Sequence, residues 1–435
     1  MNYLYLYAAV FVVILVIYSR RHLRKEAAVK AELTHAVENG LTEPPSLHPV
    51  IDASRCIGSG SCAAVCPEGA LGVVKGKAVL INAAHCIGHG ACMPACPFDA
   101  IKLVFGTEKR GIDIPHVTPG FETNVKGIFI AGELGGMGLI RKAAQQGREA
   151  IASIRKRIGQ PASGGEGVLD VVIVGCGPAG LSAGLSSLHH KLRYHLIEQE
   201  DSLGGAVYQY PRQKIAMTAP VVLDIIGSVK FSEVQKEKLL EFWNDVVKKT
   251  GLQIAFRERM EGIEKVGEHF EVITNRGRYR TRTVLLAMGR RGTPRKLGVP
   301  GEDAPKVAYS LIDPEQYKGQ SVLVVGGGDS ALEAALAVAG QPQTPPVVLS
   351  YRSAAFSRVK QKNREALEQA QKAGRVQVML NSEVREITAT SVQIAREGQV
   401  QSLKNDIVIV CAGGLLPTPL LQKVGIQFET KHGTE

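Results

Sequence analysis

The sequence predicts an α/β protein in which two three-layer domains, each a parallel sheet between helices, follow a small α+β domain and one N-terminal helix. Three observations support this fold class. An apolar, β-rich run leads into a glycine-rich turn and a helical stretch twice, from Leu169 and from Ser321. Six of the eight cysteines fall in two near-copies of one pattern between Cys56 and Cys96, and an uncharged apolar run opens the chain. Strand–turn–helix units predict parallel sheets covered by helices, and the repeat predicts a pseudo-symmetric pair of sites.

Composition narrows the class of protein. The 435 residues suggest two to four domains, at roughly 100–200 residues per domain. With 45% apolar and 21% charged residues, the chain is not disordered. Its formal net charge of +11 is compatible with a nucleic-acid partner or an anionic membrane surface. We expect no nucleic-acid partner, because the sequence has no recognised module and no basic stripe interleaved with aromatic residues.

The N-terminal run carries no charge from Tyr3 to Tyr18, and a cluster of basic residues follows at once. Its sixteen residues are slightly fewer than the about 17–25 residues that a membrane-spanning helix needs. Arginine side chains that snorkel to the interface extend the length that the helix can span. We therefore expect a single-pass transmembrane anchor over residues 1–19, a membrane-localised protein, and a cytoplasmic soluble part on the side of the positive charges. The alternatives are a buried core helix and a cleaved leader, although the basic residues lie on the wrong side for a signal peptide. Residues 20–48 are expected to form a spacer.

Residues 49–105 hold the cysteine repeat. Each copy reads C-I-G-x-G-x-C-x-x-x-C-P, and the second begins at Cys86, thirty residues after the first. The spacing matches the C-x2-C-x2-C-x3-C-P run of bacterial ferredoxins at every position but the second, where Ser59 and His89 stand. The segment therefore resembles a two-cluster ferredoxin domain, which is small and of the α+β class.

This resemblance implies two iron–sulfur clusters whose ligands cross between the copies, because the cysteine before each proline reaches the other cluster. The first cluster would take Cys56, Cys62 and Cys96, with Ser59 at its fourth corner. The second would take Cys86, Cys92 and Cys66, with His89 at its fourth corner. With three thiolates each, the clusters would be of the 4Fe–4S or 3Fe–4S type. The alternatives are a zinc site with three cysteines and a histidine, and structural disulfides.

The run from Leu169 forms a dinucleotide-binding fingerprint. Its glycine-rich turn contains Gly175, Gly177, Pro178, Ala179 and Gly180. A helix-like stretch follows, and the next strand ends in Glu198, eighteen residues after the last glycine. In such a unit the glycines allow a tight turn, a pyrophosphate lies at the helix N-terminus, and the acid holds the ribose hydroxyls. A glycine turn without a ligand is the alternative, which the complete strand–turn–helix unit disfavours.

The run from Ser321 forms a second fingerprint, with Gly326, Gly328, Asp329, Ser330 and Ala331. Its second strand ends without an acidic residue, and Arg352 and Arg358 follow instead. Because guanidinium groups bind a 2′-phosphate, this site favours NADPH over NADH. The alternative is that the two arginines line a solvated loop.

Two dinucleotide folds, the second inserted into the first, resemble the thioredoxin-reductase-like flavoproteins. The further motifs that carry the resemblance are Gly204-Gly205, Leu286-Ala-Met-Gly289 and Ala412-Gly-Gly-Leu-Leu-Pro417. The resemblance implies two Rossmann-like domains, with FAD bound by residues 168–298 and NAD(P) by residues 299–412, and a return to the FAD domain over residues 413–435. It also places Gly204, Gly205 and Gly289 in the flavin site.

One element of that family lies out of order. The segment that normally closes the flavin domain has the form T-x-x-x-G-I-F-x-A-G-D followed by a helix, and here it stands upstream, from Thr123 to Glu133. We therefore expect a circular permutation in which residues 106–160 supply the last strand and helix of the FAD domain. Gly132 and Glu133 would then lie near the flavin, with Glu133 in place of the usual aspartate beside the ribityl chain. Permutation is tolerable because domain termini usually lie close together at the surface.

The expected activity is electron transfer. Thioredoxin reductases use a C-x-x-C pair that this sequence lacks in its nicotinamide domain, and Cys176 and Cys411 are expected to be small buried residues. We expect a membrane-anchored FAD-dependent oxidoreductase that moves electrons between NADPH and an acceptor through FAD and two iron–sulfur clusters, with no acid–base residue. The partner would be a ferredoxin, a quinone or a cytochrome, and the likeness is compatible with a homodimer. The alternatives are a flavin-dependent reductase of low-molecular-weight disulfides and a non-enzymatic membrane-tethered redox or NADPH sensor.

Overall fold

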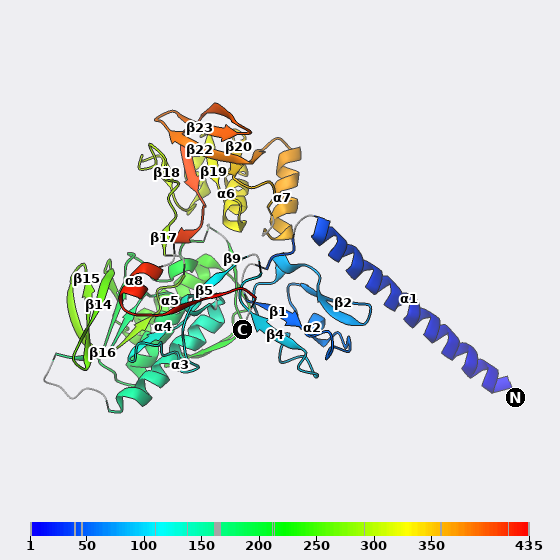
Figure 1. Cartoon of the computed structure of the whole chain (residues 1–435), viewed down its shortest axis with the longest axis horizontal. Helices are drawn as coiled ribbons and strands as arrows, with labels where there is room; N and C mark the ends of the chain where they lie inside the picture. The colour runs from blue at the N-terminus through cyan, green and yellow to red at the C-terminus, as the bar shows by residue number, and fades with distance from the viewer. Residues whose placement is uncertain are drawn as a thin grey trace. The chain divides into compact units, whose positions relative to one another are not determined.

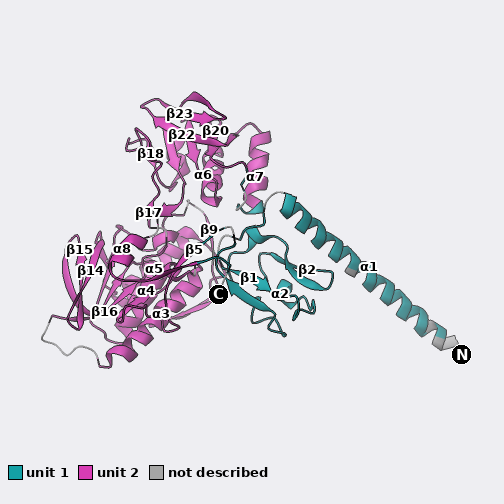
Figure 2. Ribbon diagram, in the orientation of Figure 1, with its two compact units in different colours: residues 1–112, 355–361, 431–435 teal, residues 113–354, 362–430 magenta. Residues whose placement is uncertain are grey.

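The computed structural model describes residues 2–38, 41–44, 47–108, 110–136, 138–160, 167–210, 212, 214–290, 292–356, 359–415 and 417–433. Its contacts divide the chain into two compact units, coloured separately in Figure 2. Unit 1 comprises residues 1–112, 355–361 and 431–435. Unit 2 comprises residues 113–354 and 362–430.

The N-terminal run of unit 1 lies in one long helix, α1 (Asn2–Glu38), drawn in dark blue in Figure 1. In the part of the chain that the structure describes, no helix combines the length and the apolar character needed to cross a membrane. The predicted transmembrane anchor over residues 1–19, and the membrane localisation with a cytoplasmic soluble part, are therefore wrong. The run from Tyr3 to Tyr18 has only sixteen residues, and the helix continues beyond it without a break into Arg20 and Arg21. A hydrocarbon core requires about 20 consecutive apolar residues.

The cysteine repeat folds into short elements held by two antiparallel strand pairs. The first and last strands, β1 (His48–Ile51) and β4 (Ile101–Val104), pair with each other and so close the segment on itself. Between them β2 (Leu71–Val74) and β3 (Lys77–Leu80) form a hairpin, and the short helices are α2 (Ser61–Ala64) and η1 (Ala83–His85). Buried cysteines share this small core with aliphatic residues: Cys56, Cys62, Leu71, Ala78, Cys92, Ala100 and Ile101.

The first fold of unit 2 is built on a seven-stranded sheet. Its strands are β6 (Ile128–Ile130), β7 (Leu169–Val174), β8 (Tyr194–Glu198), β13 (Ala255–Phe256), β14 (Met260–Val266), β15 (His269–Thr274) and β16 (Gly277–Leu286). The strands β13, β8, β7 and β16 run parallel, and β14 and β15 extend the first half of β16 as an antiparallel meander. Along β7 the side chains alternate between two cores, since Ile173 belongs to one and Val172 to the other. Both faces are buried, as expected for a parallel sheet.

The upstream segment of the flavin motif lies in this sheet. β6 pairs in parallel with the second half of β16, from Val284 opposite Ile128 to Leu286 opposite Ile130. The helix after it, α3 (Ile140–Ile158), packs along α4 (Pro178–His189), the helix that follows the first glycine turn. Figure 1 shows these two helices side by side. β6 and α3 thus belong to the first fold although they precede β7 in the chain, which is the order of elements that the predicted circular permutation requires.

The second fold of unit 2 has a five-stranded parallel sheet. Its strands in spatial order are β18 (Val307–Ala308), β25 (Ile407–Val410), β19 (Val322–Val325), β20 (Val347–Tyr351) and β21 (Val376–Leu380). Its helices are α6 (Asp329–Ala339) and α7 (Gln361–Lys372). An antiparallel sheet of β22 (Ser382–Ile387), β23 (Ser391–Arg396) and β24 (Gln399–Lys404) forms a further layer. The mixed α/β class with two Rossmann-like folds is therefore as predicted.

Small elements complete unit 2. The two-stranded pairs are β9 (Ile215–Met217) with β12 (Glu233–Gln235), β10 (Val221–Leu223) with β11 (Gly227–Val229), β17 (Thr293–Pro294) with β26 (Gly414–Leu415), and β5 (Ile112–Pro115) with β27 (Phe428–Lys431). The remaining helices are η2 (Glu133–Gly135), η3 (Gly205–Val207), α5 (Lys236–Thr250), η4 (Pro314–Tyr317) and α8 (Thr418–Lys423). After the second fold, Leu421 and Ile426 return to the core of the first one.

Candidate functional site

The first glycine turn can be built only from glycine at two positions. Gly175, directly after β7, has a φ of +99°, and a Cβ there would lie 2.8 Å from the Ala287 carbonyl oxygen. A Cβ on Gly180 would overlap the carbonyl oxygen of Gly175. The glycine turn and the first helical turn of α4 are therefore in backbone contact, which a side chain at either glycine would prevent.

The N-terminus of α4 has the features of an anion site. Gly177 is its N-cap residue and provides no side-chain cap, and Pro178 is its first helical residue. Gly204 and Gly205 border this turn, since the Gly204 N–H donates to the Cys176 carbonyl oxygen at 2.9 Å and a Cβ on Gly205 would lie 3.1 Å from the Gly177 Cα. The uncapped N–H groups and the absence of side chains around them fit the pyrophosphate of a dinucleotide.

Glu198 lies at the end of β8, with 6% of its surface exposed. Its carboxylate accepts hydrogen bonds from the Cys176 N–H at 2.7 Å and the Glu200 N–H at 3.1 Å. Burial raises the pKa of Glu198, and these two backbone bonds oppose the rise. The acid is thus anchored beside the glycine turn, where it could accept from ribose hydroxyls.

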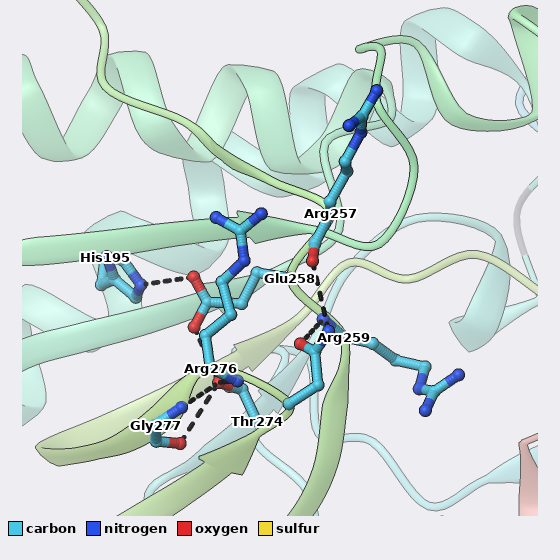
Figure 3. A network of polar contacts seen from close by, with 8 residues as sticks. His195, Arg257, Glu258, Arg259, Thr274, Arg276 and Gly277 are labelled. Atoms are coloured by element: carbon cyan, nitrogen blue, oxygen red, sulfur yellow. Dashed lines mark hydrogen bonds and ion pairs between the residues drawn. The ribbon is translucent and has the colours of Figure 1, made fainter.

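A buried polar network, drawn in Figure 3, supports the strand that carries Glu198. The Glu258 N–H donates to the Glu198 carbonyl oxygen at 2.9 Å. The buried Glu258 carboxylate accepts from Thr274 Oγ1 at 2.7 Å and lies 3.3 Å from His195 Nε2. Thr274 Oγ1 in turn accepts from the N–H groups of Arg276 and Gly277. Since every polar atom named here has a partner, we assign the network a structural role.

The segment of β6 and α3 also borders the first glycine turn. Gly132 has a φ of +84°, and its N–H donates to Gln146 Oε1 at 2.8 Å. A Cβ on Gly132 would lie 3.0 Å from the Ala179 Cβ, and one on Gly147 would overlap the Ala179 carbonyl oxygen. These glycines bring β6 and α3 against the start of α4. Gly147 and Gln146 were not predicted as site residues, although a glycine inside a helical pattern is a signal of close packing.

Charged residues gather near Gly132. Arg290, next to Gly289, donates from Nη2 to the Asp113 carbonyl oxygen at 2.7 Å. Burial lowers the pKa of Arg290, and the negative charges of Glu133 and Asp113 oppose this. Gly289 itself has a φ of +67° and open space where a Cβ would stand. Arg290 was also not predicted, because nothing in its local sequence marks a half-buried arginine.

The second glycine turn repeats the pattern of the first. Gly326 has a φ of +148°, and a Cβ there would overlap the Cys411 carbonyl oxygen. Gly328 is the N-cap residue of α6, provides no side-chain cap, and has open space around it. Ser330 and Ala331 follow in the first turn of α6, where the Ser330 carbonyl oxygen accepts a hydrogen bond from the Cys411 thiol at 3.8 Å. This turn also fits a pyrophosphate.

The acidic groups of α6 are held by neighbouring side chains. Asp329 Oδ1 accepts from Asn363 Nδ2 at 2.7 Å. Glu333 Oε2 lies 2.6 Å from Lys214 Nζ, which comes from the first fold. The structure places Arg352 as an exposed side chain directly after β20, at the carboxyl edge of the sheet. Arg358, the second predicted 2′-phosphate ligand, lies outside the described residues.

The cysteines of unit 1 surround two hollows. The first, partly open to solvent, is lined by Cys56, Cys62, Cys96 and Ser59 together with small and apolar residues. The second, also partly open, is lined by Cys66, Cys86, Cys92 and His89. Each hollow thus takes two cysteines from one copy of the repeat and the third from the other copy. This lining is compatible with the crossed ligand sets that the resemblance to ferredoxins implies, which remain a prediction.

The electrostatics of the hollows suit a cationic group bound by thiolates. Burial, with a smaller contribution from the neighbouring Cys86 and Cys66, raises the pKa of Cys92 to about 11. Burial likewise raises the pKa of Cys62 and Cys86. Clustered thiolates are therefore stable only around a positive centre such as iron. Backbone N–H groups already point at two sulfurs, from Ala78 to Cys56 at 3.3 Å and from Ala100 to Cys96 at 3.4 Å.

The other possible uses of the cysteines are not seen. None of the eight cysteines forms a disulfide in the structure. Over the described residues, no three His, Cys, Asp or Glu side chains are grouped closely enough to hold a single metal ion. Cys176 is fully buried, and burial raises its pKa far above the usual range of a thiol.

Two parts of the chain match known protein families. Residues 172–434 match the profile of the pyridine nucleotide-disulphide oxidoreductases. Residues 48–97 match the 4Fe-4S dicluster domain. The first match begins inside β7, so β6 and α3 lie outside it. FAD, NADP and iron–sulfur clusters are thus the cofactors of this chain.

Individual relatives of this chain are reductases. The ferredoxin–NADP reductase of Ignicoccus hospitalis is 29% identical over 252 residues, which cover 58% of this chain and 74% of the relative. The bacilliredoxin reductase Bdr of Bacillus subtilis is 26% identical over 270 residues, 60% of this chain and 82% of the relative. Among solved structures, the bacillithiol disulfide reductase Bdr of Staphylococcus aureus aligns with a TM-score of 0.52 at 25% identity, over 59% of this chain and 80% of that one.

Proposed function

The chain belongs to the pyridine nucleotide-disulphide oxidoreductase family, and on this premise we propose that it moves electrons between NADPH and a ferredoxin-type protein through FAD and two iron–sulfur clusters. It is an FAD-dependent oxidoreductase of pyridine nucleotides that also carries a 4Fe-4S dicluster domain. The observation that carries the proposal is that one chain contains two glycine turns and two hollows, and that each hollow is lined by cysteines from both copies of the repeat. A reductase of small disulfides has no need of such hollows.

The residues of the chain bind and orient the cofactors. When bound, NADPH supplies a hydride, and FAD accepts its electron pair and can release it one electron at a time to iron–sulfur clusters. The glycine turns at Gly175 and Gly326 would hold the two pyrophosphates, and Glu198 would hold the FAD ribose. Arg352 and, on the sequence alone, Arg358 would hold the 2′-phosphate of NADPH. Gly132 and Glu133 would border the flavin. The thiols of the two hollows hold the clusters, and no side chain is required to transfer a proton in a hydride step.

The partner is proposed from the relatives. A protein 29% identical to this chain is a ferredoxin–NADP reductase. A one-electron carrier suits a chain with its own one-electron centres, because the clusters would pass single electrons to the carrier. We therefore place a ferredoxin-type protein ahead of a quinone or a cytochrome as the partner.

Anaerobic stopped-flow mixing of the holoprotein with NADPH tests the function. We expect rapid bleaching of the flavin absorbance, followed by bleaching of the broad iron–sulfur absorbance in the same molecules, and then reduction of an added ferredoxin. Flavin bleaching that never reaches the clusters would overturn the proposal. The same mixing with NADH serves as a control for nucleotide preference.

A second candidate function is reduction of a low-molecular-weight disulfide, which the two Bdr relatives favour. The residues argue against a thiol mechanism at Cys176, since this thiol is fully buried and its pKa is raised by burial. Turnover of a Cys176→Ser variant with NADPH and small disulfides decides the matter. Unchanged turnover removes this role for Cys176.

Replacing Arg352 by alanine is expected to raise KM for NADPH by about tenfold to hundredfold and to leave KM for NADH nearly unchanged. The reason is that the exposed guanidinium at the end of β20 would pair with the 2′-phosphate, which NADH lacks. Steady-state kinetics with both nucleotides give the result. Arg385→Ala is the matched control, because Arg385 is an exposed arginine of the same fold paired with Glu383. Equal losses with both nucleotides in the Arg352 variant would contradict the assignment.

A further inference from the structure

We propose that the two hollows hold unequal clusters: a four-iron cluster capped by His89 in one, and a three-iron cluster beside Ser59 in the other. The inference rests on the proposed function, in that both hollows must hold clusters. It goes beyond that function by assigning the fourth iron ligand and the cluster type. It arises at the positions where both copies of the repeat lack the second cysteine.

The backbone presents the two residues in the same way. Ser59 lies between Gly58 and Gly60, with φ values of +72° and +76°. His89 lies between Gly88 and Gly90, with φ values of +82° and +72°. The loops thus have matching left-handed glycines on both sides of the residue in question. Any difference between the two fourth corners must come from the side chains themselves.

His89 is suited to bind iron. Its half-buried side chain lines the second hollow together with Cys66, Cys86 and Cys92. A neutral imidazole has a nitrogen lone pair in the plane of the ring and ligates iron without losing a proton. Three thiolates and one imidazole supply the four ligands of a complete four-iron cluster.

Ser59 is poorly suited to the same role. The residue is exposed at the edge of the first hollow, and its Oγ lies 3.3 Å from Ser61 Oγ. A hydroxyl must lose its proton to bind iron as an alkoxide, and its C–O bond is shorter than the C–S bond of a cysteine. The first hollow therefore offers three thiolates, from Cys56, Cys62 and Cys96, and no efficient fourth ligand. Three ligands suit a three-iron cluster.

Iron analysis and electron paramagnetic resonance (EPR) of the anaerobically reconstituted full chain test this inference. We expect about seven iron atoms per chain and, in the oxidised protein, the EPR signal of a three-iron cluster. With ¹⁵N-histidine labelling, the reduced four-iron cluster should show nitrogen hyperfine coupling. The coupling is a readout that a merely structural histidine would not produce.

Variants test which residue, if any, is the fourth iron ligand of each cluster. His89→Ala should lose the nitrogen coupling and about one iron atom per chain, whereas His89→Cys should keep the iron and lose the coupling. Ser59→Cys should gain about one iron atom and lose the three-iron signal. His85→Ala and Ser61→Ala are the controls, because among the described residues neither side chain lines a hollow and neither substitution adds a possible iron ligand. Both should leave the iron and the spectra unchanged.

The outcomes separate this inference from the function beneath it. Two four-iron clusters in the wild type, or the absence of nitrogen coupling, would overturn the unequal assignment and leave the electron-transfer function standing. A reconstituted chain without iron–sulfur absorbance would overturn the proposed function itself. Loss of iron in the two control variants to the same extent would assign the effects to folding and would overturn the roles given to His89 and Ser59.

Discussion

Replacing Gly180 by alanine is expected to produce a chain that no longer retains FAD. The added Cβ would overlap the carbonyl oxygen of Gly175, a backbone atom that cannot rotate away, and would lie 3.5 Å from the Ala287 Cβ. The strain can be relieved only by separating the start of α4 from the glycine turn. That movement would displace the uncapped N–H groups that we assign to the pyrophosphate.

The expected size of the effect follows from the overlap. Forcing an extra methyl group into a closed backbone contact costs about 1–3 kcal/mol, and the displaced anion site adds a loss of affinity of about tenfold or more. Flavin absorbance per chain after desalting, and thermal unfolding with and without added FAD, measure the two parts.

Gly277→Ala is the control for this substitution. Gly277 begins β16 in the same fold, and a Cβ there would meet no atom within 4 Å. We expect that variant to retain FAD fully. A Gly180→Ala protein with wild-type flavin content and wild-type unfolding temperature would contradict the structure of the turn.

Replacing Cys66 by serine is expected to destroy the cluster that also uses Cys86 and Cys92, although Cys66 belongs to the other copy of the repeat. The structure places these three thiols around one hollow. Conversely, Cys96→Ser should destroy the cluster of Cys56 and Cys62. Each variant should lose about half of the iron, because a cluster left with two thiolates is not retained.

Alkylation under anaerobic conditions shows which cluster is lost. In the Cys66→Ser variant, Cys86 and Cys92 should react and be detected by mass spectrometry, while the thiols of the other hollow stay protected. Cys411→Ser is the control, since Cys411 lies in the second fold of unit 2 and should not alter the iron content. If Cys56 and Cys62 were exposed in the Cys66 variant instead, the crossed arrangement would be incorrect.

Several parts of the site were predictable because their chemistry is local. The glycines of each turn, the acid at the end of the next strand and the cysteine spacing all lie within short segments whose geometry the chain itself restricts. The circular permutation is a prediction of the same kind, since the motif around Gly132 stands before β7 in the printed sequence. The pairing of β6 with β16 is compatible with it.

Other parts could not be predicted. The length of the uncharged N-terminal run suggested a membrane span, but the structure has no helix of sufficient length and apolar character among the described residues. Gly147, Gln146 and Arg290 belong to the surroundings of the first site only through tertiary contacts. No local pattern marks a side chain whose partner is far away in the chain.

The sequence by itself determined which groups are available: two glycine turns, an acid, two arginines, six clustered cysteines, and a serine and a histidine in place of two more. The tertiary structure decided which of these groups meet. It brings Cys96 to Cys56 across forty residues and sets α3 against α4 at Gly147. Residue type and spacing control local backbone geometry. Long-range contacts depend on the pairing of β6, β7 and β16 in one sheet and on the packing of other elements against its buried faces.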